Sequence, residues 1–429
     1  MTHRFARLRR FHFNLPQRIA AGLLALFLIQ GFWITGHQTL SDRDYQYARC
    51  GRETWEKPSP LAGYYTSCGN IRDGILAYRA AGLPLTINLL GQRALDAFRK
   101  PEDRVVQAST GQGGAGVSIW ELRHQMTHVL LLLRLPFLLC GAILGAGLWW
   151  VTRRLYGNMG GYTALTLYCF SPSVLKACVA PNADILAALG VYGGIYTCIG
   201  VAHAMQGPRR KWRPRIILLT VLFAIAAASH IVALPVTALL GLVLMIWIAE
   251  GRRSQLLPVV LLASGGALLL LFACYGFSPD AFSYIFRSGS GFLSISLEPA
   301  RRYFSTFSNA GIIVAAAAAA LLYLGVGRAR YFGNSAPLLC FLLLLALVST
   351  GAQATPWLWS VPFLLTFIGG VFADAFESQR GKIAVAAAAS IIVLQVVCCV
   401  TSLPGLVEGR DLHLSGLIIH ASDLAWTQR

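Results

Sequence analysis

The sequence is poor in charged residues. Of its 429 residues, 13% are charged and 56% are hydrophobic, whereas soluble domains carry roughly a quarter charged residues. This scarcity excludes an ordinary soluble globular chain. Apolar runs of about 20 residues recur along the sequence, and each can cross the roughly 30 Å hydrocarbon layer as a helix. The sequence therefore predicts an all-α protein, a single membrane domain over residues 1–429 that crosses the bilayer many times.

Metal-binding and phosphate-binding motifs are also missing. The ten cysteines include no CxxC pair, and the sequence has no HExxH motif and no cluster of cysteine and histidine. A structural zinc or haem site is therefore not expected. The glycine-rich stretch 109–118 is not flanked by a strand and a helix as a phosphate-binding loop is, so we interpret it as a flexible linker.

Acidic residues are half as numerous as basic ones, 18 against 36, which gives a net charge of +18. Basic surfaces attract nucleic acid, but the topology accounts for this excess. With the N-terminus inside, the inner segments carry 18 of the 36 basic residues and three of the 18 acids, as the positive-inside rule requires. No nucleic acid is expected. These inner segments are 1–18, 152–157, 206–215, 250–255, 327–335 and 374–382.

Hydropathy predicts about eleven spans. The first lacks a small-residue cleavage site, so we expect a retained anchor. The long run 216–249 is divided near Ser229-His230, with Pro235 just beyond. The spans lie near 19–36, 127–151, 158–175, 183–205, 216–231, 232–249, 256–277, 309–326, 336–353, 356–373 and 383–403.

Three segments are predicted to lie outside the membrane: the loops 37–126 and 278–308 and the tail 404–429. In the first loop, residues 85–99 carry apolar residues every three or four positions, which predicts an amphipathic helix on the membrane surface. Cys50 and Cys68 are the two cysteines of this loop. An oxidising compartment permits their pairing, and the disulfide would stabilise the loop by about 3 kcal/mol.

Two acids follow the first span directly. Asp42 and Asp44 lie near the lipid surface and beside aromatic rings, where a carboxylate can act as a general base. The alternative is that both are solvated loop acids paired with Arg43, Arg49 or Arg52.

A third acid, Asp184, is at the start of the fourth span. An ionisable residue at the mouth of a membrane helix is a functional candidate. Alternatively, it is a first-turn acid favoured by the helix dipole, neutralised by Lys176. His230, near an outer turn, is interpreted as a hydrogen-bonded polar residue.

Arginines also gather near the predicted outer face. Arg301 and Arg302 precede the eighth span, and guanidinium groups suit phosphate because each can bind two of its oxygens. The alternative is contact with acidic lipid or snorkelling to the interface. Arg123 offers the same choice, and Arg134 lies deeper, within the second span, where it needs a partner.

A recognisable order of motifs lies within residues 133–196 and after the first span. The motifs are Arg134-Leu135-Pro136, Arg153 to Gly157, Ser171-Pro172 and Asp184, then Asp42, Tyr45, Tyr47, Ala48 and Arg49 after the first span. With these motifs, residues 133–196 resemble the second-to-fourth-span region of the fold C glycosyltransferases, which include protein O-mannosyltransferase and aminoarabinose-transferase relatives, and the stretch after the first span resembles the family's first outer loop. Arg43 stands where the family usually has a second acid, with Asp44 as a substitute. The stretch from Thr355 to Pro362 has no arginine where the family has an Arg-Tyr element, and the tail 404–429 stands where it has a large outer domain.

The resemblance implies a glycosyltransferase that moves a sugar, with inversion, from a polyprenyl-phosphate donor to an acceptor at the outer, periplasmic face. Its place would be a bacterial inner membrane, with the N-terminus cytoplasmic and the C-terminus periplasmic. The acceptor (glycan, lipid or protein) stays open, and membrane lipids and membrane-protein partners are expected. The implied roles are base for Asp42, reserve base for Asp44, donor-phosphate binding for Arg301, Arg302 and Arg123, and support for Asp184, Lys176 and Tyr45. A divalent ion shared by Asp42 and Asp184 is compatible with this chemistry but not required.

Two other classes of function stay open. A non-catalytic membrane subunit that retains this scaffold is favoured by Arg43 at the usual acid position, because a fold by itself does not establish activity. A transporter of lipid-linked substrates would show inverted repeats, which we do not find, and its ionisable residues would lie at the membrane midplane rather than at one face.

Overall fold

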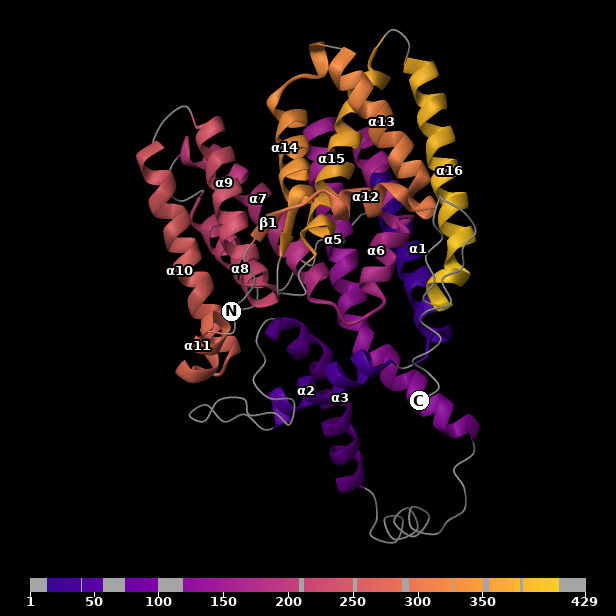
Figure 1. The fold of residues 1–429 in the computed structure, drawn as a ribbon, viewed down its shortest axis with the longest axis vertical. Coiled ribbons are helices and arrows are strands. Elements are labelled where there is room, and N and C mark those ends of the chain that lie inside the picture. The colour runs from indigo at the N-terminus through magenta and orange to yellow at the C-terminus, as the bar shows by residue number, and fades with distance from the viewer. Residues whose placement is uncertain are drawn as a thin grey trace, which may run out of the picture.

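A computed structural model shows this protein as a tall helical bundle with a pair of helices, α2 and α3, below its lower end (Figure 1). The protein is all-α apart from one short two-stranded ribbon in the described part. The described residues are 14–39, 41–56, 74–98, 119–207, 212–249, 253–287, 293–325, 327–349, 355–378 and 381–408. The glycine-rich stretch 109–118 and Cys68 lie outside them.

Seven helices of the described part are long and apolar enough to cross a membrane. They identify an integral membrane protein, because a spanning helix needs about 20 apolar residues to satisfy its backbone inside lipid. Four of them are α1 (Leu15–His37), α7 (Ala183–Met205), α15 (Pro356–Phe376) and α16 (Gly381–Glu408). The other three lie in α5 (Ile119–Cys169), in α10 (Leu256–Cys274) with η2 (Arg253–Gln255), and in α13 (Ala310–Gly325) with η3 (Phe307–Asn309).

Helix α5 contains two of the predicted spans in one continuous element of 51 residues. The two are separated by a kink at Gly157, whose φ of 77° and ψ of −174° are non-helical. A positive φ of this kind is readily adopted by glycine alone, because glycine has no Cβ. The predicted turn 152–157 therefore ends at the residue that redirects the helix.

The apolar run 216–249 is divided where the sequence predicts. Helix α8 (Arg213–Ser229) ends before His230, and α9 (Ala233–Ile248) begins just after it. At 17 and 16 residues, these helices measure about 24–26 Å, less than the full hydrocarbon thickness. Helix α14 (Phe332–Ala346), with 15 residues, is shorter still and follows the turn η4 (Gly327–Ala329). The predicted total of eleven membrane crossings therefore stays a prediction.

Helices α2 (Asp42–Glu56) and α3 (Ile75–Phe98) form the pair below the bundle (Figure 1). The predicted helix 85–99 is the second half of α3, which begins earlier because the apolar repeat extends upstream. The two helices cross at Gly51 and Gly82. A Cβ on Gly82 would lie 2.3 Å from the Gly51 carbonyl oxygen, so only glycine permits this approach. Cys50, beside the crossing, is buried and disulfide-bonded.

The second predicted outer segment, 278–308, is tied to the end of α14 by the ribbon. Strand β1 (Leu293–Ile295) pairs antiparallel with β2 (Leu347–Ser349), and Leu293 is opposite Ser349. This pairing places α12 (Glu298–Ser305) beside α14. Helix α11 (Pro279–Arg287) continues from the lower end of α10 (Figure 1).

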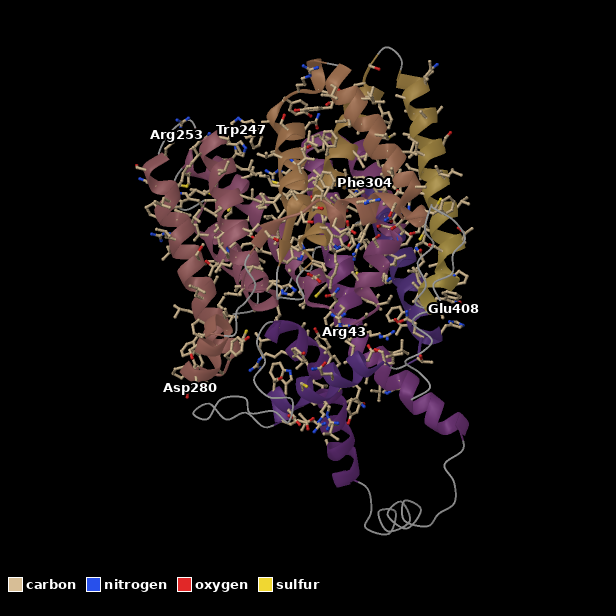
Figure 2. All side chains as sticks on the ribbon, viewed as in Figure 1. Arg43, Trp247, Arg253, Asp280, Phe304 and Glu408 are labelled. Carbon is tan, nitrogen blue, oxygen red and sulfur yellow. The ribbon has the colours of Figure 1, made fainter. Side chains whose placement is uncertain are left out.

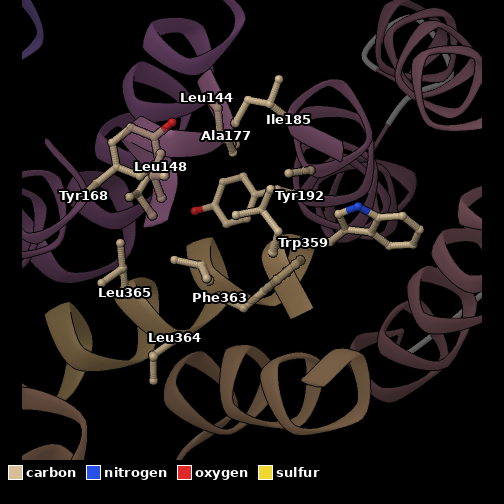
Figure 3. Close-up of a cluster of buried hydrophobic side chains, with 14 of the residues drawn as sticks. Leu144, Leu148, Tyr168, Ala177, Ile185, Tyr192, Trp359, Phe363, Leu364 and Leu365 are labelled. Atoms are coloured by element: carbon tan, nitrogen blue, oxygen red, sulfur yellow. The ribbon is translucent and has the colours of Figure 1, made fainter. Parts of the chain in front are cut away.

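Helix α15 is the centre of the bundle. It packs against α5, α7 and α14. Of the 18 residues that form its most apolar stretch, 89% are buried inside the protein. Figure 3 shows Tyr192 of α7 facing Phe363 of α15, with ring centroids 5.1 Å apart. The Tyr192 hydroxyl is 3.0 Å from the Thr366 hydroxyl. Because this core fixes α15, the N-terminal end of the helix is also fixed, and that end borders the candidate site.

Candidate functional site

A cavity of about 1460 Å³ separates the pair α2–α3 from the bundle. Its lining residues come from α2 and α3 on one side and, on the other, from the short helix α6 (Pro172–Cys178), from α12 and η3, and from the beginning of α15. Figure 2 shows Arg43 of α2 below and Phe304 of α12 above. We call these two sides the α2–α3 wall and the bundle wall.

The α2–α3 wall carries an arginine on a pair of stacked tyrosines. The rings of Tyr47 and Tyr78 are nearly parallel, at 10°, with centroids 4.3 Å apart. The Arg43 guanidinium lies over the Tyr47 ring, 5.8 Å from its centroid, within the range of a cation–π interaction. The pKa of Tyr78 is raised to about 12, mainly by burial and also by nearby Tyr47, while Arg43 opposes the rise. The Tyr78 hydroxyl is therefore protonated at neutral pH and can donate a hydrogen bond into the cavity.

The bundle wall carries two cations, Lys176 on α6 and Arg302 on α12. The Arg302 Nε lies 3.1 Å from Glu298 Oε1, one helical turn away, and both side chains are more than half exposed. An exposed pair of this kind contributes about 0–1 kcal/mol. Arg302 can therefore exchange this partner for a ligand anion at little cost. Tyr303 and Trp357 also line the cavity, with ring centroids 5.6 Å apart.

Asp184 holds the beginning of α15 in place. It is 2% exposed, and its Oδ1 accepts hydrogen bonds from the Thr355 backbone N–H at 2.8 Å and the Trp359 indole N–H at 3.1 Å. The His230 Nε2 is 3.3 Å from the same oxygen. The first-turn interpretation of Asp184 is thus correct in position, and Asn182 caps the helix by accepting from the Asp184 backbone N–H. However, this carboxylate is bound by two other segments rather than by Lys176.

Asp44 and Arg134 are each other's partners. Arg134 Nη2 lies 2.6 Å from Asp44 Oδ2, and Arg134 Nε lies 3.2 Å from Asp44 Oδ1. The side chains are 1% and 4% exposed, and Gln38 Oε1 accepts from Arg134 Nη1. Asp44 also closes a capping box with Ser41 at the start of α2, an arrangement that stabilises a helix N-terminus. Asp44 is therefore not a solvated loop acid, and it is not among the described lining residues.

The remaining predicted site residues have different positions. Lys176 and Arg302 line the cavity, as does Asp184, whereas the exposed Tyr45 and Arg301 are not among its described lining residues. Asp42 begins α2 and Arg123 lies in α5, but their side chains are outside the described part. The proposed pairing of Cys50 with Cys68 stays a prediction, since residue 68 is also outside it.

Sequence reasoning missed two residues of the cavity, Arg43 and Tyr78. Arg43 was interpreted as a departure from a family pattern, yet it lines the cavity. Tyr78 lies beyond any predicted motif, and its stacking with Tyr47 depends on the glycine crossing of α2 and α3. The signal available in the sequence was the small residue on each helix, Gly51 and Gly82, because helices approach closely at such positions.

A metal site finds little support in the described residues. They contain no group of three or more histidine, cysteine or acidic side chains that could hold a metal ion. The Oδ1 atom of Asp184 already accepts from two N–H donors. The Asp42 side chain is outside the described part, so an ion shared by Asp184 and Asp42 stays a prediction.

Comparison of the chain with protein-family models and with curated proteins finds no match. The resemblance to the fold C glycosyltransferases therefore rests on the motifs in the sequence.

Proposed function

We propose that this protein is a membrane glycosyltransferase that binds a polyprenyl-phosphate sugar in the cavity between α2–α3 and the bundle. The observation that carries the proposal is the meeting of three cations, Arg43, Lys176 and Arg302, in one cavity. They come from three segments far apart in the sequence. A lipid phosphate that leaves during transfer develops negative charge, which Lys176 and Arg302, together on the bundle wall, can stabilise.

The position of the cavity suits a substrate with a lipid tail and a polar head. Its walls include the ends of membrane helices, among them Leu358 of α15 and Leu406 of α16. Beside it, Ile295 and Leu297 are 82% and 73% exposed, and such apolar side chains favour contact with lipid. A polyprenyl chain could remain in the bilayer while its phosphate and sugar enter the cavity.

The proposed location follows from the charge distribution. The basic segments between helices would face the cytoplasm, with the cavity and α2–α3 at the periplasmic side of a bacterial inner membrane. The N-terminus would then be cytoplasmic and residues 404–429 periplasmic. The fold C arrangement of about eleven spans belongs to the same proposal.

The proposed reaction is a displacement at the anomeric carbon of the sugar. An acceptor oxygen or nitrogen forms a new bond to this carbon from the face opposite the phosphate, so that the configuration inverts. The bond from the carbon to the phosphate oxygen breaks, and its electron pair leaves with the lipid phosphate. A base takes the acceptor proton. Asp42 is the proposed base, because Asp44 is held by Arg134 and Asp184 by the start of α15.

The second candidate is a non-catalytic subunit that retains the cavity. The observation that favours it is the state of the described carboxylates. Asp44 and Asp184 are buried and bound, and the lining residue Glu298 is paired with Arg302. If the Asp42 side chain is not presented to the cavity, the described lining offers the acceptor proton Glu298 alone as an exposed carboxylate, and this group is released only when Arg302 binds an anion instead.

The deciding experiment is transfer of labelled sugar from polyprenyl-phosphate donors by the purified full-length protein in lipid nanodiscs. Asp42→Asn should lower the rate by about 10²- to 10⁴-fold, the usual contribution of a general base, with an unchanged melting temperature. Asp280→Asn removes an exposed acid of α11 and should leave the rate unchanged. Well-folded wild type that neither binds nor turns over any such donor would favour the non-catalytic subunit.

A further inference from the structure

Arg43 is the most available cation of the cavity. It is exposed, it lines the cavity, and it has no carboxylate partner within the part of the chain that the structure describes. Its guanidinium lies over Tyr47, which in turn is stacked on Tyr78. A guanidinium positioned by aromatic rings keeps its N–H donors free for an anion.

The aromatic rings beside Arg43 are themselves well positioned. Tyr47 is 7% exposed, and the backbones of α2 and α3 are in contact at Gly51 and Gly82. The stacked rings therefore give the Arg43 guanidinium a defined surface on which to lie. A side chain guided in this way loses less conformational freedom when it binds an anion.

Arg43 and the other two cations are on opposite sides of the cavity. Arg43 belongs to the α2–α3 wall, whereas Lys176 and Arg302 belong to the bundle wall. Figure 2 shows this separation between Arg43 and Phe304, which is on the same helix as Arg302. Transfer requires two substrates in one cavity, one on either side of the bond that is exchanged. The leaving phosphate needs one group of cations, and the second cationic position is then available to the acceptor.

We infer that Arg43 binds an anionic group on the acceptor, so that the acceptor is a phosphorylated or carboxylated glycan or lipid rather than a neutral one. This inference rests on the proposed function and adds the chemical class of the second substrate. A neutral acceptor placed against the α2–α3 wall would displace water from Arg43 without supplying an anion, and removing an unpaired cation from water is unfavourable.

Equilibrium binding of two matched probes tests the inference. Hexyl β-glucoside 6-phosphate and uncharged hexyl β-glucoside have the same sugar, the same tail and the same hydroxyls at C2, C3 and C4. The first carries a phosphate ester in place of the C6 hydroxyl, and only it is anionic. Each is titrated into the full-length protein in neutral-lipid nanodiscs, without donor. Wild type should bind the phosphate about tenfold more tightly, the effect of roughly one charge-assisted hydrogen bond.

The variants locate the effect. Arg43→Gln should reduce the preference for the phosphate clearly, with the remainder due to Lys176 and Arg302 on the bundle wall. Arg43→Lys should keep more of the preference than Arg43→Gln, because lysine retains the charge but not the planar donor pair. Arg52→Gln is the matched control: it removes an arginine of the same helix that is paired with Glu56 and does not belong to the described lining. It should bind both probes as wild type does.

Two outcomes would overturn the inference: equal binding of both probes by wild type, or a preference that Arg43→Gln leaves intact. The proposed function is judged separately, by binding and turnover of the polyprenyl-phosphate donor. Selective binding of the phosphate by wild type, reduced in Arg43→Gln but without any donor binding, would support an anion site and reject the transferase.

Discussion

At the scale of single residues, Asp44 is a structural acid. Its carboxylate is paired with Arg134 and caps α2. Removing one partner of a buried pair leaves the other charge uncompensated, which typically costs about 3–5 kcal/mol. We expect Asp44→Asn to lower the melting temperature of the purified protein strongly.

The matched changes separate structure from catalysis. The double variant Asp44→Leu/Arg134→Met removes both charges. It should unfold at a higher temperature than either single variant, because no charge is then buried without a partner. Asp280→Asn, on the exposed surface of α11, should change stability by less than about 1 kcal/mol. An Asp44→Asn protein with normal melting but no sugar transfer would contradict this assignment and identify Asp44 as a base.

At the scale of elements, the crossing of α2 and α3 supports the Arg43 site. A methyl group on Gly82 would meet the backbone of Gly51 at 2.2–2.3 Å, so the helices must separate. Gly82→Ala should therefore destabilise the pair by about 1–3 kcal/mol and weaken selective binding of the phosphorylated glucoside, since Tyr47 and Tyr78 would no longer hold Arg43. Thermal unfolding and probe binding measure the two effects.

Gly91 on the same helix supplies the control. A Cβ there has no atom within 4 Å, and alanine is favoured over glycine within a helix by up to about 1 kcal/mol. Gly91→Ala should be neutral or slightly stabilising and should bind the probe normally. If both alanine variants behaved alike, the close approach of α2 and α3 would not control the site.

At the scale of the whole molecule, the distribution of basic residues predicts which ends of the helices face the cytoplasm. Helix α10 has Ser254 of η2 before it and Asp280 of α11 after it, and both residues are exposed. In intact cells, a membrane-impermeant thiol reagent should label Asp280→Cys but not Ser254→Cys. After permeabilisation it should label both. Within the described residues, the eight free cysteines are buried or half-buried, which keeps the background labelling low. The reverse pattern would invert the topology and place the cavity in the cytoplasm.

The helical, membrane-embedded character of this protein was determined by the sequence itself. The hydropathy of a segment depends only on residues that are adjacent in the sequence. Inside lipid, a single continuous apolar segment can satisfy its backbone hydrogen bonds only as a helix. For the same reason, the break at His230 and the turn ending at Gly157 could be placed without any tertiary information. The position of Asp184 at the start of a helix was likewise predictable, because first-turn acids follow local rules.

The partners of the polar residues were decided by the tertiary structure. Asp44 and Arg134 are 90 positions apart, and the segments that hold Asp184 lie on α15 and between α8 and α9. The hydropathy of a single segment does not reveal which neighbour it packs against. The cavity likewise exists only because the β1–β2 pairing places α12 beside α14 and the glycine crossing places Tyr78 under Tyr47. Packing between distant segments thus made Arg43, which looked like an exception in the sequence, the most available cation of the site.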